Sequence, residues 1–236
     1  MNIKELDAII ALTNVTIGFI TYWFLSQSII VENYFALRYP KQQQVYFILF
    51  QRYIGFLFLG LLPSIVTFVF LPTSWADYGV KFPESIETLY WILGLAAIII
   101  PLNAWNAKKA DNLLMYPQIR ATEWTKNTFI QEYTSWIAYL LAYELLFRGF
   151  LLFALYRISG GWVATMVNVA LYAIAHIPKG QKEAIGAIPL GLLLCYLTLH
   201  TGDIWIAVIV HITLALSNSF FSFLAQPNMK YVKDKL

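Results

Sequence analysis

The chain has 236 residues, of which 59% are hydrophobic and 12% charged, with 16 basic and 13 acidic residues giving a net charge of +3. A soluble domain does not need so much apolar surface, and the small basic excess is typical of a membrane protein anchored by cytoplasmic Lys and Arg, not of a nucleic-acid-binding protein. Cys195 is the single cysteine, which excludes an internal disulfide and zinc sites built on several cysteines. The composition therefore predicts one polytopic membrane domain.

Apolar stretches long enough to cross a bilayer as helices, which takes about 20 residues, recur along the chain. In chain order we expect seven spans, at about 8–30, 45–71, 88–105, 128–157, 162–177, 184–200 and 204–225. The pair Gly160-Gly161 separates the fourth span from the fifth. The sequence thus predicts an all-α transmembrane bundle with N-terminal spans and a loop over residues 1–127, a core over 128–226 and a basic tail over 227–236.

Basic residues gather in alternate connecting loops. They follow the first, third and fifth spans and fill the tail: Arg38, Lys41, Lys108, Lys109, Arg120, Lys126, Lys179, Lys182, Lys230, Lys233 and Lys235. Because positive loops stay on the cytoplasmic side, we expect the N-terminus outside and the C-terminus in the cytoplasm. The expected membrane is a bacterial inner membrane. Membrane lipids are then obligatory partners, and a membrane protein or peptide is a further expected partner or substrate.

One segment carries opposite charges deep in an apolar run. Glu144 and Arg148 lie inside the run from 128 to 158. Each charge costs about 2.5–3.5 kcal/mol at membrane depth, and a spacing of four puts the two on one helix face. We therefore expect a paired, inward-facing site on the fourth span.

Two other late spans carry unusual polar groups. Asn168, Tyr172 and His176 follow one another at steps of four, and His211 and Asn218 are seven apart on one face of the last span. A carboxylate with two imidazoles supplies a base, an orienting partner and an oxyanion donor, or ligands for a metal. The alternatives are groups that only hold the bundle together and the polar site of a small transporter or channel.

These segments resemble three motifs of the CAAX-protease and bacteriocin-processing (CPBP or Abi) family, over about residues 128–224. The family pattern is Glu-Glu-x-x-x-Arg, then Phe-x-x-x-His, then His-x-x-x-Asn; here the corresponding segments are Tyr143 to Arg148, Tyr172-x-x-x-His176, and His211. The resemblance implies a polar cavity open to the cytoplasmic face. Active members are glutamate-dependent intramembrane endopeptidases, in which the first Glu and first His activate water while the last His and the Asn stabilise the oxyanion. That scheme needs no cofactor, although a divalent metal stays an open alternative.

The sequence departs from the family pattern at two positions. Tyr143 replaces the first Glu, and Ala215 stands where Asn is expected. A phenol, with an ordinary pKa near 10, is a poor general base at neutral pH. Glu144 points about 100° away from position 143 on a helix, so it does not simply replace the missing acid.

We therefore hypothesise the following roles. Glu144 with His176 activates water, Arg148 orients Glu144, His211 with Asn218 or Tyr143 holds the oxyanion, and Tyr172 and Asn168 face the substrate. The alternative is a catalytically inactive family member that binds or positions a membrane partner.

Two further expectations concern placement. Glu183 either folds back over the cavity or is a solvated loop acid, and we expect the latter. On a simple layout Glu144 lies near mid-membrane, His176 near the cytoplasmic surface and His211 in the outer half, so that their depths differ by more than a hydrogen bond.

Overall fold

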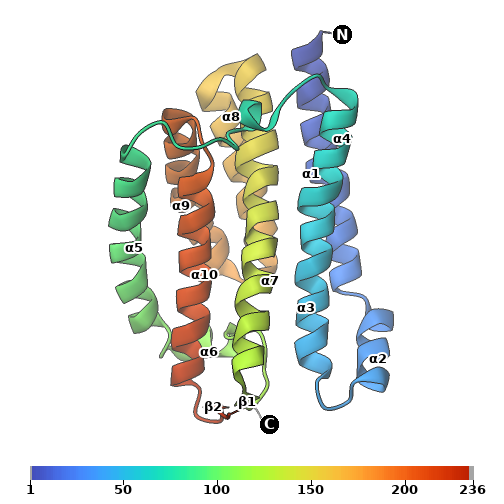
Figure 1. Cartoon of the computed structure of the whole chain (residues 1–236), viewed down its shortest axis with the longest axis vertical. Coiled ribbons are helices and arrows are strands. Elements are labelled where there is room, and N and C mark those ends of the chain that lie inside the picture. The colour runs from blue at the N-terminus through green and yellow to red at the C-terminus, as the bar shows by residue number, and fades with distance from the viewer. Residues whose placement is uncertain (1, 234–236) are drawn as a thin grey trace.

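The computed structural model describes residues 2–233, and this part of the chain is almost entirely helical (Figure 1). The helices are α1 (Ile3–Ser26), α2 (Ile29–Arg38), α3 (Gln43–Phe56), η1 (Leu57–Leu61), α4 (Leu62–Phe70), η2 (Trp75–Tyr78), α5 (Glu87–Asn106), α6 (Ala110–Met115), α7 (Lys126–Glu144), η3 (Leu145–Leu151), α8 (Leu152–His176), η4 (Ile177–Lys179), α9 (Gln181–Thr201) and α10 (Trp205–Ala225). Two short strands, β1 (Glu123–Trp124) and β2 (Lys230–Tyr231), pair in parallel. The expectation of an all-α bundle is confirmed.

Six continuous helical stretches in residues 2–233 are long and apolar enough to cross a membrane. One of them, Lys126–Lys179, has 54 residues, far more than one crossing needs. It contains the expected break, because Gly160 has a φ of 78° and a ψ of 174°, which is not helical. Figure 1 shows the chain turning back on itself at the top of α8, so this one stretch covers the expected fourth and fifth spans.

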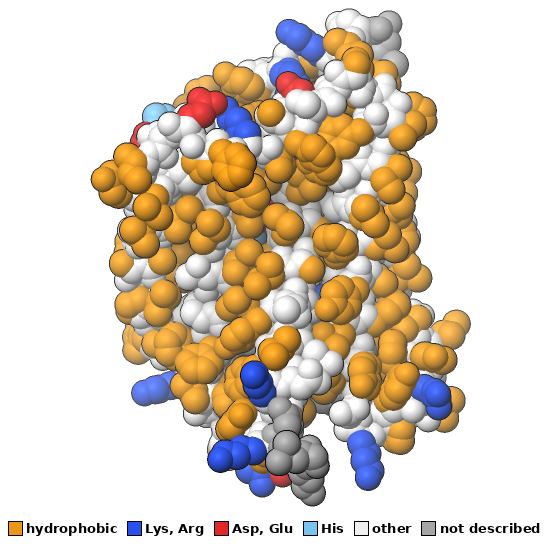
Figure 2. All heavy atoms as spheres, viewed as in Figure 1, with side chains coloured by type: hydrophobic (Ala, Val, Ile, Leu, Met, Phe, Trp, Pro, Cys, Tyr) orange, Lys and Arg blue, Asp and Glu red, His pale blue; other side chains and the backbone are white. Residues whose placement is uncertain are grey.

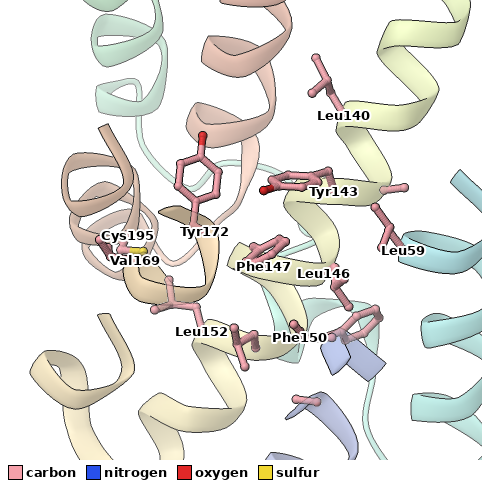
Figure 3. Close-up of a cluster of buried hydrophobic side chains, with 14 of the residues drawn as sticks. Leu59, Leu140, Tyr143, Leu146, Phe147, Phe150, Leu152, Val169, Tyr172 and Cys195 are labelled. Carbon is pink, nitrogen blue, oxygen red and sulfur yellow. The ribbon is translucent and has the colours of Figure 1, made fainter. Parts of the chain in front are cut away.

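The core lies around the long stretch that contains α7, η3 and α8. Within the most apolar window of that stretch 72% of the residues are buried, against 6% for α5. Large apolar side chains from η3 and α8 fill the centre (Figure 3). Small residues allow close helix contact beside it, since a Cβ added at Gly60 would lie 2.6 Å from the Cβ of Ala142. The charged motif is thus carried by the most enclosed element of the bundle.

Two short segments in residues 2–233 are π-helical. The segment η1 ends two residues before Pro63, which has no backbone N–H to donate. The segment η3 follows Glu144 and contains Arg148. Wide turns of this kind often occur at functional sites, and η3 forms part of the site described below.

The surface is divided into an apolar middle and charged ends (Figure 2). Hydrophobic side chains cover the middle of the face shown, and Lys and Arg side chains lie towards the ends. Exposed side chains such as Ile17, Phe24 and Val69 are between 61% and 71% accessible, as expected of groups that contact lipid tails.

Candidate active site

Glu144, the last residue of α7, joins two helices that are distant in sequence. Its side chain is fully buried, and Oε1 lies 2.6 Å from Nδ1 of His211 on α10. The other carboxylate oxygen, Oε2, lies 3.2 Å from Nη1 of Arg148. The pair between Glu144 and Arg148 is therefore inward-facing, and the carboxylate is shared with an imidazole.

Arg148 is enclosed without well-aligned hydrogen bonds. Its guanidinium carbon lies 4.0 Å from the centre of the Tyr172 ring, an arrangement that favours a cation. None of its three side-chain nitrogens makes a well-aligned hydrogen bond within residues 2–233. Its charge is therefore balanced by the ion pair to Glu144 and by the tyrosine ring.

His176 ends α8 and faces His211 across the site. Its Nδ1 donates to the carbonyl oxygen of Tyr172 at 2.8 Å, because a carbonyl can only accept. The two imidazole rings are 6.4 Å apart between centroids, with their planes at 28°. In the neutral state both rings carry the proton on Nδ1, and both Nε2 atoms have a free lone pair.

Tyr143 occupies the position between these groups. Its ring lies 5.8 Å from His211 and 6.2 Å from His176, nearly perpendicular to both. Figure 3 shows its ring next to Phe147 and Tyr172, with the hydroxyl directed towards the α8 side. The hydroxyl is buried and has no hydrogen-bond partner in the described part of the chain, so it is a donor with nothing to donate to.

A cavity of about 750 Å³ opens next to these residues. The two histidines, Tyr172 and Asn218 are in its lining, together with polar residues of the loop around α6 and of the turn between α8 and α9. Glu144, Arg148 and Tyr143 are not in the lining and lie behind it. The imidazoles thus separate the buried carboxylate from the cavity.

The expectation that the three ionisable groups lie at different depths is wrong. Glu144 is bonded to His211, and the imidazole of His176 lies next to that of His211. The reason is the short descending part of α8: the 16 residues from Gly161 to His176 rise about 24 Å, less than the roughly 30 Å of a bilayer core. The helix therefore ends inside the bundle.

Asn218 and Asn168, both expected in the site, do not contact Glu144, His176 or His211 through hydrogen bonds. Asn218 lines the cavity, but its side chain makes no hydrogen bond to any described residue. Asn168 lies outside the lining and is fully buried, donating to the carbonyl of Phe147 at 2.5 Å and accepting from Cys195. Asn168 therefore joins α8 to the π-helical segment through a second hydrogen bond to the Phe147 carbonyl, which also accepts from the Leu152 N–H.

Glu183 lies over the cavity, in contrast to the expected solvated loop acid. It is half-buried in the lining, and its Oε1 accepts from the hydroxyl of Tyr116 at 2.9 Å. Burial and the nearby Glu183 carboxylate raise the pKa of Tyr116 well above its usual value, so the phenol stays protonated and donates. The contact joins the α6 loop to α9 at the cavity.

Sequence reasoning missed a second buried ion pair beside the cavity. Arg52 on α3 and Glu132 on α7 are 3% and 0% exposed and lie 2.7 Å apart. The available signal was the same as for Glu144, namely charged residues inside apolar runs. Within residues 2–233, no group of three or more His, Cys, Asp or Glu is arranged to hold a metal ion.

Part of the chain matches the model of a known family. Residues 126–217 match the family model described as type II CAAX prenyl endopeptidase Rce1-like. This segment is similar to the CAAX-protease family. The Rce1-like segment, as residues 126–217 are called below, contains Glu144, Arg148, His176 and His211.

The match confirms the resemblance inferred from the motifs, and with the six apolar helices it identifies an integral membrane protein. The segment extends from the start of α7 into α10 and stops just before Asn218. No curated protein and no solved structure matches the chain.

Proposed function

We propose that the protein is an intramembrane peptide hydrolase in which His211, oriented by Glu144, activates water. The observation that carries this proposal is the 2.6 Å contact between Glu144 Oε1 and His211 Nδ1, with the imidazole in the wall of a cavity. A carboxylate that accepts from Nδ1 fixes the tautomer in which Nε2 is a base. The assignment differs from the pairing of Glu144 with His176 expected from the motifs.

The proton moves in two steps. His211 Nε2 takes a proton from water as the water oxygen attacks the carbonyl carbon of the peptide. The C–N bond then breaks, and the same proton passes to the leaving amine nitrogen. Glu144 stabilises the imidazolium that forms between the steps, and Arg148 keeps Glu144 ionised in its buried position.

The other groups hold the reactants. Nε2 of His176 accepts a hydrogen bond from the second O–H of the water, and this bond orients the water oxygen for attack. The side-chain amide of Asn218, which lines the cavity, donates to the oxyanion, a role that Asn can fill. Tyr143 lies behind the lining, where its ring packs against the two imidazoles.

The description of the matched family favours prenylated CAAX peptides as substrates. The basic residues around the α6 loop and the α8–α9 turn favour an opening on the cytoplasmic side. The cleaved bond would then lie near the cytoplasmic face of the membrane.

The test is hydrolysis of a fluorogenic farnesylated peptide by the full chain in lipid nanodiscs. We expect Glu144→Gln, His176→Gln and His211→Gln each to lower kcat/KM by about 100-fold or more. His200→Gln is the matched control, because His200 is exposed and bonded to Glu87 on another part of the surface. Wild-type rates in Glu144→Gln and His211→Gln would overturn the proposed mechanism.

A second candidate is a family member that binds a peptide without cleaving it. The observation that favours it is Tyr143, which puts an aromatic ring where the family pattern has the first glutamate. In that case the wild-type protein binds the farnesylated peptide without hydrolysis, and Tyr143→Glu gains hydrolytic activity. Cleavage by the wild-type protein that is lost in Glu144→Gln excludes this candidate.

A further inference from the structure

The ion pair of Arg52 and Glu132 joins the N-terminal spans to the core. Nη1 of Arg52 lies 2.7 Å from Oε2 of Glu132 and also donates to the Glu132 carbonyl at 3.1 Å and the Ser135 hydroxyl at 2.9 Å. Its Nη2 donates to Gln118 at 3.1 Å. Unlike Arg148, this guanidinium is held by directed hydrogen bonds, which fix its position.

The same pair fixes the indole of Trp136. The indole N–H donates to Glu132 Oε1 at 3.0 Å, and the guanidinium carbon of Arg52 lies 4.1 Å from the ring centre. Ser219 on α10 donates to the same carboxylate oxygen at 2.6 Å. The ring cannot turn without losing a buried hydrogen bond and a cation contact, so its orientation depends on α3 and α10 as well as on α7.

Trp136 also belongs to the lining of the cavity that contains His176 and His211. Its side chain is only 3% exposed and closely packed, so the fixed position of the indole sets the shape of that wall. On the cavity side, the ammonium of Lys179, three residues after His176, lies 5.9 Å from the ring centre. A large rigid side chain therefore stands next to the proposed chemistry.

Stability alone does not account for a charged pair at this place. Replacing a buried ion pair by apolar side chains of similar size is often neutral or stabilising. In this pair the carboxylate accepts from Arg52, Trp136 and Ser219, so its hydrogen bonds also fix the geometry of the cavity wall.

We propose that the Arg52–Glu132 pair is a positioning element that holds Trp136 as a rigid wall of the cavity, and that Trp136 limits the size of the substrate side chain accepted beside the histidines. Arg52 lies outside the Rce1-like segment. The N-terminal spans thereby influence substrate choice through one side chain. The substrate part of this inference rests on the proposed function, whereas the cavity wall does not.

The first test compares hydrolysis of the farnesylated peptide by two variants, Arg52→Lys and its control Arg157→Lys. Arg52→Lys keeps the charge and loses the planar fork that contacts Glu132, Ser135 and Gln118. We expect it to raise KM about fivefold, the equivalent of one hydrogen bond, with kcat changed by less than about twofold. Trp136→Ala should shift the preference towards peptides with a bulkier residue next to the cleaved bond.

The matched control is Arg157→Lys. Arg157 pairs with Asp7 of α1 at 2.6 Å, so this pair also links an N-terminal span to the core, but neither residue lines the cavity. We expect Arg157→Lys to lower the melting temperature without changing KM. Equal changes of KM in the two lysine variants would show a general structural effect and overturn the proposal.

A second measurement needs no hydrolysis. Ala215 lines the cavity, so Ala215→Cys in a Cys195→Ala background reports access through its rate of labelling by a cationic thiol reagent. We expect Arg52→Lys to speed this labelling and Arg157→Lys to leave it unchanged. If the wild-type protein cleaves nothing, the proposed hydrolysis fails while the labelling rates still decide the role of Arg52; identical rates in both variants reject that role.

Discussion

At the scale of single residues, the site depends on one carboxylate shared by two partners. Glu144 contacts Arg148 with one oxygen and His211 with the other. Removing Arg148 leaves the charge of a fully buried carboxylate unbalanced, which costs several kcal/mol, and removing His211 takes away the hydrogen-bond donor to the other carboxylate oxygen. The site therefore requires all three residues together. The motif Glu-x-x-x-Arg forms the proposed site only when His211, from a distant helix, contacts the glutamate.

Asn168 provides a test at this scale, because it stabilises the π-helical segment and not the substrate. We expect Asn168→Ala to remove one of the two hydrogen bonds to the Phe147 carbonyl, the other coming from the Leu152 N–H, and to lower the free energy of unfolding by about 0.5–1.5 kcal/mol. Thermal unfolding in detergent measures the loss. Asn218→Ala, which removes no hydrogen bond to a described residue, is the control, and an equal loss there would contradict the assigned role.

At the scale of elements, the turn at Gly160 decides how α8 returns into the bundle. Its backbone, at φ 78° and ψ 174°, lies in a region that only glycine adopts without strain. This reversal starts the descending part of α8 that ends at His176. The position of His176 therefore follows from a backbone conformation 16 residues earlier in the chain.

Gly160→Ala should strain this turn, at a cost of about 1–3 kcal/mol in the free energy of unfolding. The space around Gly160 is open, so the cost comes from the backbone and not from a clash. Gly186→Ala is the matched control, since Gly186 is helical and also has open space around it. Thermal unfolding of Gly160→Ala and Gly186→Ala measures the cost of the strained backbone. A similar melting temperature in both variants would argue against backbone strain at Gly160.

At the scale of the whole molecule, charge is distributed unequally between the two ends. The end at which α1 begins has Lys4 in the first turn of α1, Arg157, which contacts Asp7 of α1 and the Asp77 carbonyl of η2, and Lys81, which follows η2 in the chain. The opposite end has the remaining basic residues of the described loops, including Lys108, Lys109 and those around the cavity mouth. The positive-inside rule therefore favours a cavity that opens to the cytoplasm.

This orientation is open to a direct test with reporter fusions. Green fluorescent protein fused to the C-terminus should fluoresce, and alkaline phosphatase at the same position should be inactive, because that end is expected in the cytoplasm. A phosphatase fusion after Lys81, on the opposite end, is the internal control and should be active. The reverse pattern would contradict the orientation and with it the cytoplasmic opening of the cavity.

The sequence by itself determined the helical class, the approximate spans and the main candidate residues. Apolar runs about 20 residues long require helices in a bilayer, because the backbone has no other partners there. Charges inside such runs are costly unless they face one another, so Glu144, Arg148 and His211 were evident candidates. The family resemblance rests on the same residues.

Only the tertiary structure decided which of these groups meet. Contacts between site side chains depend on where each helix begins, how long it is and how its π-helical turns rotate its faces. These properties in turn depend on contacts between helices that are distant in sequence. The bond from Glu144 to His211, the placement of Asn168 away from the cavity and the network of Arg52, Glu132 and Trp136 all involve residues more than 20 positions apart. Sequence spacing constrains one helix face at a time, whereas the site is formed between helices.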